Sequence, residues 1–129
     1  RRQKGCSVGD RIFKQGQGWR LGFDPQGSTH PFLIGAEDWA VELTQAEFED
    51  FRRLTQELRQ TVVAIAPELM AEERISCELE SDRLWLEIEG YAQAYELRFI
   101  LHQGRRAEGR WAASVLPEFF VALDQFHHF

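Results

Sequence analysis

The chain contains few cysteines, which could cross-link a small protein, and few lysines, which would make its surface strongly basic. Its 129 residues include two cysteines, one methionine and only two lysines, Lys4 and Lys14. Cys6 and Cys77 stand far apart, with no partner motif around either, so neither a disulfide framework nor a zinc site is predicted. A free, buried thiol at Cys77 and a reducing, cytoplasmic setting are expected instead.

Long apolar runs are also missing. No stretch approaches the roughly 20 apolar residues that span a bilayer, and the beginning lacks the basic-then-apolar pattern of a signal peptide. The sequence starts at Arg1 rather than at a methionine, which leaves a trimmed start open. A chain of this length buries about two-thirds of its unfolded surface on folding. We therefore expect one globular domain over residues 1–129, with no membrane contact.

Recognisable catalytic and cofactor motifs are missing as well. Gly16, Gly18 and Gly22 resemble a dinucleotide loop only weakly, because they lead into a strand and offer no helix amino terminus to a phosphate. No histidine pair has the spacing of a zinc site; the four are His30, His102, His127 and His128. We expect a non-catalytic protein without metal or cofactor. An active site assembled from separated loops is the open alternative.

Charge is plentiful but unevenly distributed. The net charge is −6. Residues 1–36 carry a net charge of +4, residues 37–96 carry −11 and residues 97–129 carry +1. The acidic total argues against general affinity for nucleic acid, whereas the basic amino-terminal part leaves a local basic surface open.

Two helices are predicted from capping and periodicity. Thr44 and Glu47 fit a capping box at the start of the first helix, and Pro67 ends it. Its apolar residues recur in steps of three and four: Phe48, Phe51, Leu54, Leu58, Val62 and Ile65. The second helix begins at Pro117, a residue favoured in a first turn. Its apolar residues are Phe119, Phe120, Leu123 and Phe126.

Strands are predicted in most of the remainder, because short segments alternate with period two between glycine-rich turns. The segments are 11–15, 19–23, 32–35 and 39–43 before the first helix, and 75–80, 84–89, 95–101 and the surroundings of Arg110-Trp111 after it. The order predicts an α+β fold of two tandem strand-rich repeats, ββββα-ββββα. We expect twisted antiparallel sheets with the two helices packed on one side.

The two halves, approximately 8–66 and 74–129, also resemble each other. A shift of 72 residues places Trp39 on Trp111 and Phe48 on Phe120. Two amphipathic helices always match somewhere, so a chance match is the alternative to a duplication. A fused pair of related halves replaces a two-fold homodimer, and a monomer is therefore expected.

Three segments carry a resemblance to known proteins: Gly18–Asp24, the Trp39–Thr44 entry to the first helix, and the Arg110-Trp111 strand with its short helix. Through these segments the chain resembles the cyanobacterial domain of unknown function 1818, and the resemblance extends over nearly the whole chain. The doubled four-strand-and-helix unit also resembles the fold of the Whirly proteins and of the positive-cofactor-four coactivator. That fold group includes regulators that bind single-stranded DNA, so the resemblance implies such a role. The lysine-rich strand of the Whirly proteins has no counterpart here.

Aromatic and cationic residues lie close together in the amino-terminal strands, as base stacking and phosphate neutralisation require. The candidates for weak single-stranded nucleic-acid binding are Arg11, Lys14, Trp19 and Arg20, with Arg105, Arg106 and Arg110 as further phosphate contacts. Alternation also supports a plainer interpretation, in which Trp19 faces the core and Arg20 faces solvent. Loop solvation equally explains the second cluster, which contains Glu108.

The second half offers an acidic face instead. Four glutamates alternate with apolar residues on two neighbouring strands: Glu78, Glu80, Glu87 and Glu89. Such carboxylates can hold a hard cation or raise one another's pKa, but cation sites usually draw on irregular loops. A solvated sheet face is the simplest interpretation. Docking of a basic protein partner on this face is our second functional hypothesis.

Overall fold

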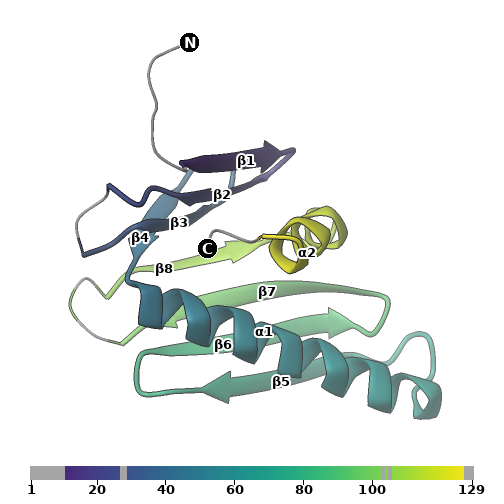
Figure 1. The fold of residues 1–129 in the computed structure, drawn as a ribbon. Helices are drawn as coiled ribbons and strands as arrows, with labels where there is room; N and C mark the ends of the chain where they lie inside the picture. The colour runs from purple at the N-terminus through teal and green to yellow at the C-terminus, as the bar shows by residue number, and fades with distance from the viewer. Residues whose placement is uncertain (1–10, 27–28, 103, 105, 127–129) are drawn as a thin grey trace.

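Figure 1 shows the computed structural model of the chain, in which residues 11–26, 29–102, 104 and 106–126 are described. The first half contains β1 (Ile12–Gly16), β2 (Trp19–Phe23), β3 (Phe32–Gly35), β4 (Ala40–Leu43) and α1 (Gln45–Ile65). After a 3-10 turn (Ala66–Glu68), the second half contains β5 (Ile75–Glu80), β6 (Leu84–Tyr91), β7 (Ala94–Leu101), β8 (Glu108–Trp111) and α2 (Leu116–Asp124). The predicted order ββββα-ββββα is confirmed.

The strands form two antiparallel sheets in sequence order. The first sheet runs β1-β2-β3-β4 and the second runs β5-β6-β7-β8. In the first sheet, Gln17 and Gly18 form a two-residue turn between paired Gly16 and Trp19. Gly18 has a φ of +86°, a left-handed value that a glycine adopts without strain in a type II turn. Both sheets are open, so each has two edge strands.

Helix α1 begins with the predicted capping box. The Thr44 hydroxyl accepts a hydrogen bond from the Glu47 amide (3.1 Å), and the Glu47 carboxylate accepts one from the Thr44 amide (2.9 Å). The helix buries the predicted apolar stripe except Ile65, which is half-buried. It ends at Ile65, and Pro67 lies in the 3-10 turn that follows. Local capping and periodicity were therefore sufficient to place this helix.

Helix α2 begins one residue earlier than predicted, at Leu116, with Pro117 inside its first turn. It lasts nine residues. The predicted apolar residues Phe119, Phe120 and Leu123 are buried, whereas Val121 is exposed. Phe126 lies just beyond the helix and is also buried. Because α2 has no side-chain cap, its position is set by packing rather than by local hydrogen bonds.

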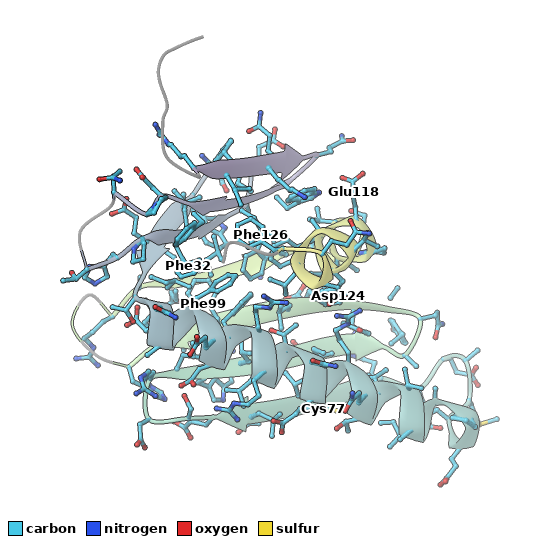
Figure 2. All side chains as sticks on the ribbon, viewed as in Figure 1. Phe32, Cys77, Phe99, Glu118, Asp124 and Phe126 are labelled. Carbon is cyan, nitrogen blue, oxygen red and sulfur yellow. The ribbon has the colours of Figure 1, made fainter. Side chains whose placement is uncertain are left out.

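The two helices pack crosswise on the sheets. Helix α1 follows the first sheet in sequence but packs mainly on β5 and β6 of the second. Helix α2 follows the second sheet, and its backbone approaches β1 and β2 of the first. In Figure 2, Phe32, Phe99 and Phe126 gather between the first sheet and α1. One core therefore contains side chains from both sheets and both helices.

Aromatic rings join the two halves at the centre of this core. Phe51 of α1 packs against Trp111 of β8, with ring centroids 5.7 Å apart, and within the first half Phe32 of β3 stacks on Phe48 of α1 at 4.2 Å. Trp111 of β8 stacks on Phe119 of α2 at 4.7 Å, and its indole N–H donates a 2.9 Å hydrogen bond to the Gly35 carbonyl of β3. Trp111 thus fills the core and satisfies a backbone acceptor of the other sheet.

Both halves have the order of four strands and a helix, but the 72-residue shift does not place the strands of one half on their counterparts in the other. The 72-residue shift aligns the starts of the two helices, yet it places β4 on residues 112–115, which follow β8. Trp39 precedes β4, whereas Trp111 ends β8. The matching of these two tryptophans is therefore not a match of equivalent positions. They lie against each other instead, with centroids 5.0 Å apart at the junction of the halves.

Asp50 ties α1 to the turn between β5 and β6. This nearly buried carboxylate accepts hydrogen bonds from the Ser81 hydroxyl (2.7 Å), Arg83 (3.3 Å) and Arg53 (3.3 Å). Burial alone would raise the pKa of Asp50, but the hydrogen bonds from Ser81, Arg53 and Arg83 favour its charged form and together lower the pKa. These hydrogen bonds of Asp50 hold α1 against the β5–β6 hairpin.

Cys77, labelled in Figure 2, is a free thiol as predicted, but it is half-buried on β5 rather than buried. Within the described residues, neither helix is long and apolar enough to cross a lipid bilayer.

Candidate functional site

Trp19, the predicted stacking residue of the first sheet, lies in the core. It is only 6% exposed, and its indole N–H donates a 2.7 Å hydrogen bond to the Glu118 carboxylate on α2. Its ring packs near Phe119, with centroids 6.2 Å apart. Alternation along β2 places Trp19 and buried Leu21 on the inner face. The structure therefore corrects the prediction that the Trp19 ring offers a platform to a nucleic-acid base.

Arg20 lies on the opposite face, as alternation predicts, but its guanidinium is held by the protein's own backbone. Its Nε donates to the Ala36 carbonyl (2.9 Å) and its Nη2 to the Trp39 carbonyl (2.8 Å). Both acceptors flank the turn between β3 and β4. Because a guanidinium group can donate to two acceptors at once, Arg20 stabilises this turn.

The other predicted cations are spread over three places. Arg11 lies 3.9 Å from Asp24, and exposed Lys14 lies on β1. Arg106 is exposed in the connection between β7 and β8, with a φ of +54°. Arg110 lies on β8, 3.8 Å from Glu96. Arg105 lies outside the described residues. Arg11 and Arg110 each lie near a carboxylate, and because Trp19 is buried the described cations do not line one groove with its ring.

The acidic face of the second sheet exists as predicted. The four predicted glutamates are exposed or half-buried on β5 and β6, while Leu84, Leu86 and Ile88 are buried beneath. Glu78 lies directly opposite Glu87 in the sheet. Two like charges in this register repel each other, and a cation supplied from elsewhere relieves that repulsion.

Arginine side chains from neighbouring segments provide part of that compensation, and a histidine ring also contacts the face. Arg98 lies 3.1 Å from Glu87, Arg74 lies 3.6 Å from Glu89 and the His102 Nε2 lies 2.6 Å from Glu80. Within the described residues, Glu78 takes part in no ion pair. The outer positions of β5 to β8 carry six glutamates, namely Glu78, Glu80, Glu87, Glu89, Glu96 and Glu108, against the two arginines Arg98 and Arg110. The face keeps an acidic excess.

An aromatic residue stands in the middle of this face. Trp85 is half-buried on β6, and the Arg98 guanidinium carbon lies 5.0 Å from its ring centroid. Its cross-strand neighbours are Glu80 on β5 and Ile100 on β7. A cation over an indole face is an attractive contact, and Glu87 orients the same arginine. We call Trp85, Glu87, Arg98 and Ile100 the second-sheet cluster.

Sequence patterns identified the glutamates of this face but missed Arg98 as a partner. The alternation of Leu97 and Phe99 places Arg98 on the outer face, but its register with Glu87 depends on the turn between β6 and β7. That turn is Ala92-Gln93, between paired Tyr91 and Ala94. It lacks the Asn-Gly or Gly-Gly signal that marks a two-residue hairpin in sequence, so the pairing was invisible.

Two hollows were also invisible in the sequence, because each joins distant segments. One, of about 430 Å³, lies between the helices and is lined by Arg59, Val63 and Asp124 among others. The other, of about 500 Å³, lies where Gly18 and Glu37 meet Val115 and Glu118. Among the described residues, no group of three or more His, Cys, Asp or Glu side chains is arranged to hold a metal ion.

These observations define a class: an α+β protein with two open antiparallel sheets, a shared aromatic core and an uncovered acidic face. The chain belongs to the family described as Domain of unknown function (DUF1818), whose model matches residues 14–126. It is also similar to a crystal structure of a protein with unknown function, from the DUF155 family, from Prochlorococcus sp. NATL2A. That similarity has 32% identity and a TM-score of 0.83 over 88% of this chain and 96% of the other. No curated protein matches the chain.

Proposed function

We propose that the protein is a monomeric, non-catalytic module that binds a basic protein partner on the outer face of its second sheet. The observation that carries the proposal is the second-sheet cluster, an aromatic residue and an arginine within an acidic, uncovered face. Tryptophan and arginine are the residue types most enriched among residues that dominate protein–protein affinity. The surrounding glutamates supply charge complementarity to lysine and arginine on the partner.

The ion pairs on this face support binding rather than argue against it. Arg98 is held by Glu87 and Trp85, so its position is fixed before a partner arrives, which lowers the entropy cost of association. Glu78 faces Glu87 across the strands. A partner cation placed between them would relieve the repulsion that the isolated face retains.

Single-stranded nucleic acid is the competing ligand. The resemblance to the Whirly and positive-cofactor-four fold implies it, and that resemblance stays a prediction. The burial of Trp19 and the separation of the cations weigh against it, because single-strand binders combine stacking rings with a continuous basic groove. A protein partner fits the acidic face better than a phosphate backbone does.

Calorimetric titration with a short lysine- and arginine-rich peptide tests the proposal. We expect binding that weakens as salt rises from about 20 to 150 mM, because the Debye length shortens. The variant Glu78/Glu80/Glu87/Glu89→Gln should bind about tenfold more weakly, since each exposed pair contributes about 0.2–1 kcal/mol. Trp85→Ala should also weaken binding.

The matched control is Glu42/Glu49/Glu68/Glu72→Gln, which removes the same charge from exposed positions outside the second sheet. If both glutamine variants lose equal affinity, net charge alone attracts the peptide and the proposal is wrong. A labelled single-stranded oligonucleotide should show no salt-dependent change in anisotropy. If the oligonucleotide binds and the basic peptide does not, nucleic-acid binding replaces the proposal.

A further inference from the structure

Strand β1 is an edge strand whose outer side has no strand partner among the described residues. It pairs with β2 only. Gly16 and Trp19 close the two-residue turn as a hydrogen-bonded pair, and hydrogen-bonded and non-bonded pairs alternate along an antiparallel ladder. The backbone N–H and C=O groups of Phe13 and Gln15 therefore point away from β2. An edge with such groups is a template for an added strand.

The described edge carries an exposed aromatic ring next to an exposed cation, Lys14. Phe13 is 56% exposed and lies over Gly22 of β2, where a side chain would crowd its ring. A hollow of about 130 Å³ lies beside it, lined by Gly22, Leu33 and Glu42 among others. Here an aromatic ring and a hollow stand beside the unpaired backbone.

The other edges differ. β4 and β8 lie at the junction of the halves, where Trp39 packs over Gly109 and Trp111 reaches Gly35. β5 is an outer edge, but its exposed side chains are Ser76, Glu78 and Glu80, with no exposed aromatic ring among them. Of these four edges, β1 is the one that combines an exposed aromatic residue with a cation.

The charge of the edge selects the occupant. Lys14 is exposed and takes part in no ion pair within the described chain. Arg11 is exposed, and its contact with Asp24 is long, at 3.9 Å. A second copy of β1 would oppose cations with cations, whereas an acidic strand would pair with them.

We propose that β1 is a docking edge, which adds an acidic, extended segment of a partner protein as a fifth strand of the first sheet. Main-chain hydrogen bonds to Phe13 and Gln15 hold the segment. An apolar side chain of the segment packs on Phe13 on the outer face of the sheet, and an acidic side chain on the other face of the segment lies beside Lys14. This mode of recognition separates affinity, which comes from the backbone, from specificity, which comes from alternate side chains. The second-sheet face takes no part in it.

Titration with a peptide of alternating glutamate and valine, followed by amide NMR, tests this inference in the whole chain. We expect the Phe13 and Gln15 amides to shift and to gain protection from hydrogen exchange, and a lysine–valine peptide to bind less tightly. Gln15→Pro removes one outward N–H at an edge position where proline is tolerated, and should weaken binding about fivefold. Lys14→Glu should weaken it, whereas the matched charge reversal Arg106→Glu should not.

Several outcomes overturn the inference. Equal binding of the two peptides removes the charge argument, and exchange protection confined to residues other than Phe13 and Gln15 places binding elsewhere. The exchange measurement uses the wild type, so it decides the question even if Gln15→Pro fails to fold. If analytical ultracentrifugation shows that the wild type is a dimer and Gln15→Pro is not, the occupant of the β1 edge is a second copy of the chain and the proposal of an acidic partner segment is wrong. Failure of the basic-peptide titration at the second sheet leaves these results unaffected, because the two surfaces share no residue.

Discussion

The two sheets have the same strand order, yet they present different outer faces. In the first sheet, the outer positions of β2 and β3 hold Gly22, Leu33 and Gly35, and Arg20 supports a turn through its hydrogen bonds. In the second sheet, the corresponding surface carries Trp85, Arg98 and an excess of glutamate. Similar backbones therefore serve different purposes. The first sheet closes the core and ends in the edge strand that we propose as a docking site, whereas the second sheet presents a broad acidic face.

The largest expected effect comes from truncating two tryptophans, one in the core and one on the outer face of the second sheet, and comparing the loss of stability. Trp111 is 1% exposed and joins both halves, so Trp111→Ala should lower the free energy of unfolding by about 3–5 kcal/mol. Trp85→Ala, on the outer face, should cost less than about 1 kcal/mol. Urea denaturation monitored by circular dichroism measures both. Equal losses would mean that the outer face is part of the folding core.

A second, smaller effect is expected at Asp50, which fixes α1 to the second sheet. Asp50→Asn should cost about 1.5–3 kcal/mol at neutral pH, because hydrogen bonds to a charged group are lost. The pKa of Asp50 is lower in the folded chain than in the unfolded chain, so its contribution is complete above the usual aspartate pKa of about 3.9. That contribution disappears as the pH falls through the folded value.

The difference in stability between wild type and Asp50→Asn should therefore shrink below about pH 4. Urea titrations at a series of pH values measure it. Glu49→Gln, on the exposed side of α1, is the control and should give a small, nearly constant difference. If the difference in unfolding free energy between wild type and Asp50→Asn stays constant down to pH 2, the assigned direction of the Asp50 pKa change is wrong.

The smallest expected effect is a gain. Thr55 is fully buried in α1, and its hydroxyl has no hydrogen-bond partner among the described residues. Thr55→Val replaces this hydroxyl by a methyl group of similar size and should stabilise the chain by about 1 kcal/mol, since a buried unpaired hydroxyl costs about 1–3 kcal/mol. Thr61→Val, at an exposed position of the same helix, should change stability less. A loss of stability in Thr55→Val would indicate a hydrogen bond to this hydroxyl.

Much of the fold could be predicted because its signals are local. The capping box at Thr44, the stripe on α1 and the alternation in β5 and β6 each depend on neighbours in the chain. The strand boundaries moved by one or two residues, as at Trp39, which precedes β4 instead of beginning it, and at β6, which ends at Tyr91. The 72-residue match was less informative, because the similarity of two amphipathic helices does not define strand register.

The candidate sites were harder to predict, because exposure depends on what packs above each residue. Alternation placed Trp19 and Arg20 on opposite faces, but it did not reveal that Glu118 on α2 accepts from Trp19. Nor did it reveal that two backbone carbonyls hold Arg20. The pairing of Arg98 with Glu87 required the register across a turn without glycine. Contacts between segments far apart in sequence decide which cations and rings are available to a ligand.

The crosswise packing of the helices also constrains the order of events on the ribosome. The apolar stripe of α1 is synthesised before β5 and β6, the strands on which it packs. Because chains grow at about 5–20 residues per second, this stripe stays without its native cover for seconds after it is made. A nascent first half would thus expose Phe51, Leu54 and Leu58 to chaperones, and the native core can close only after the second half has emerged.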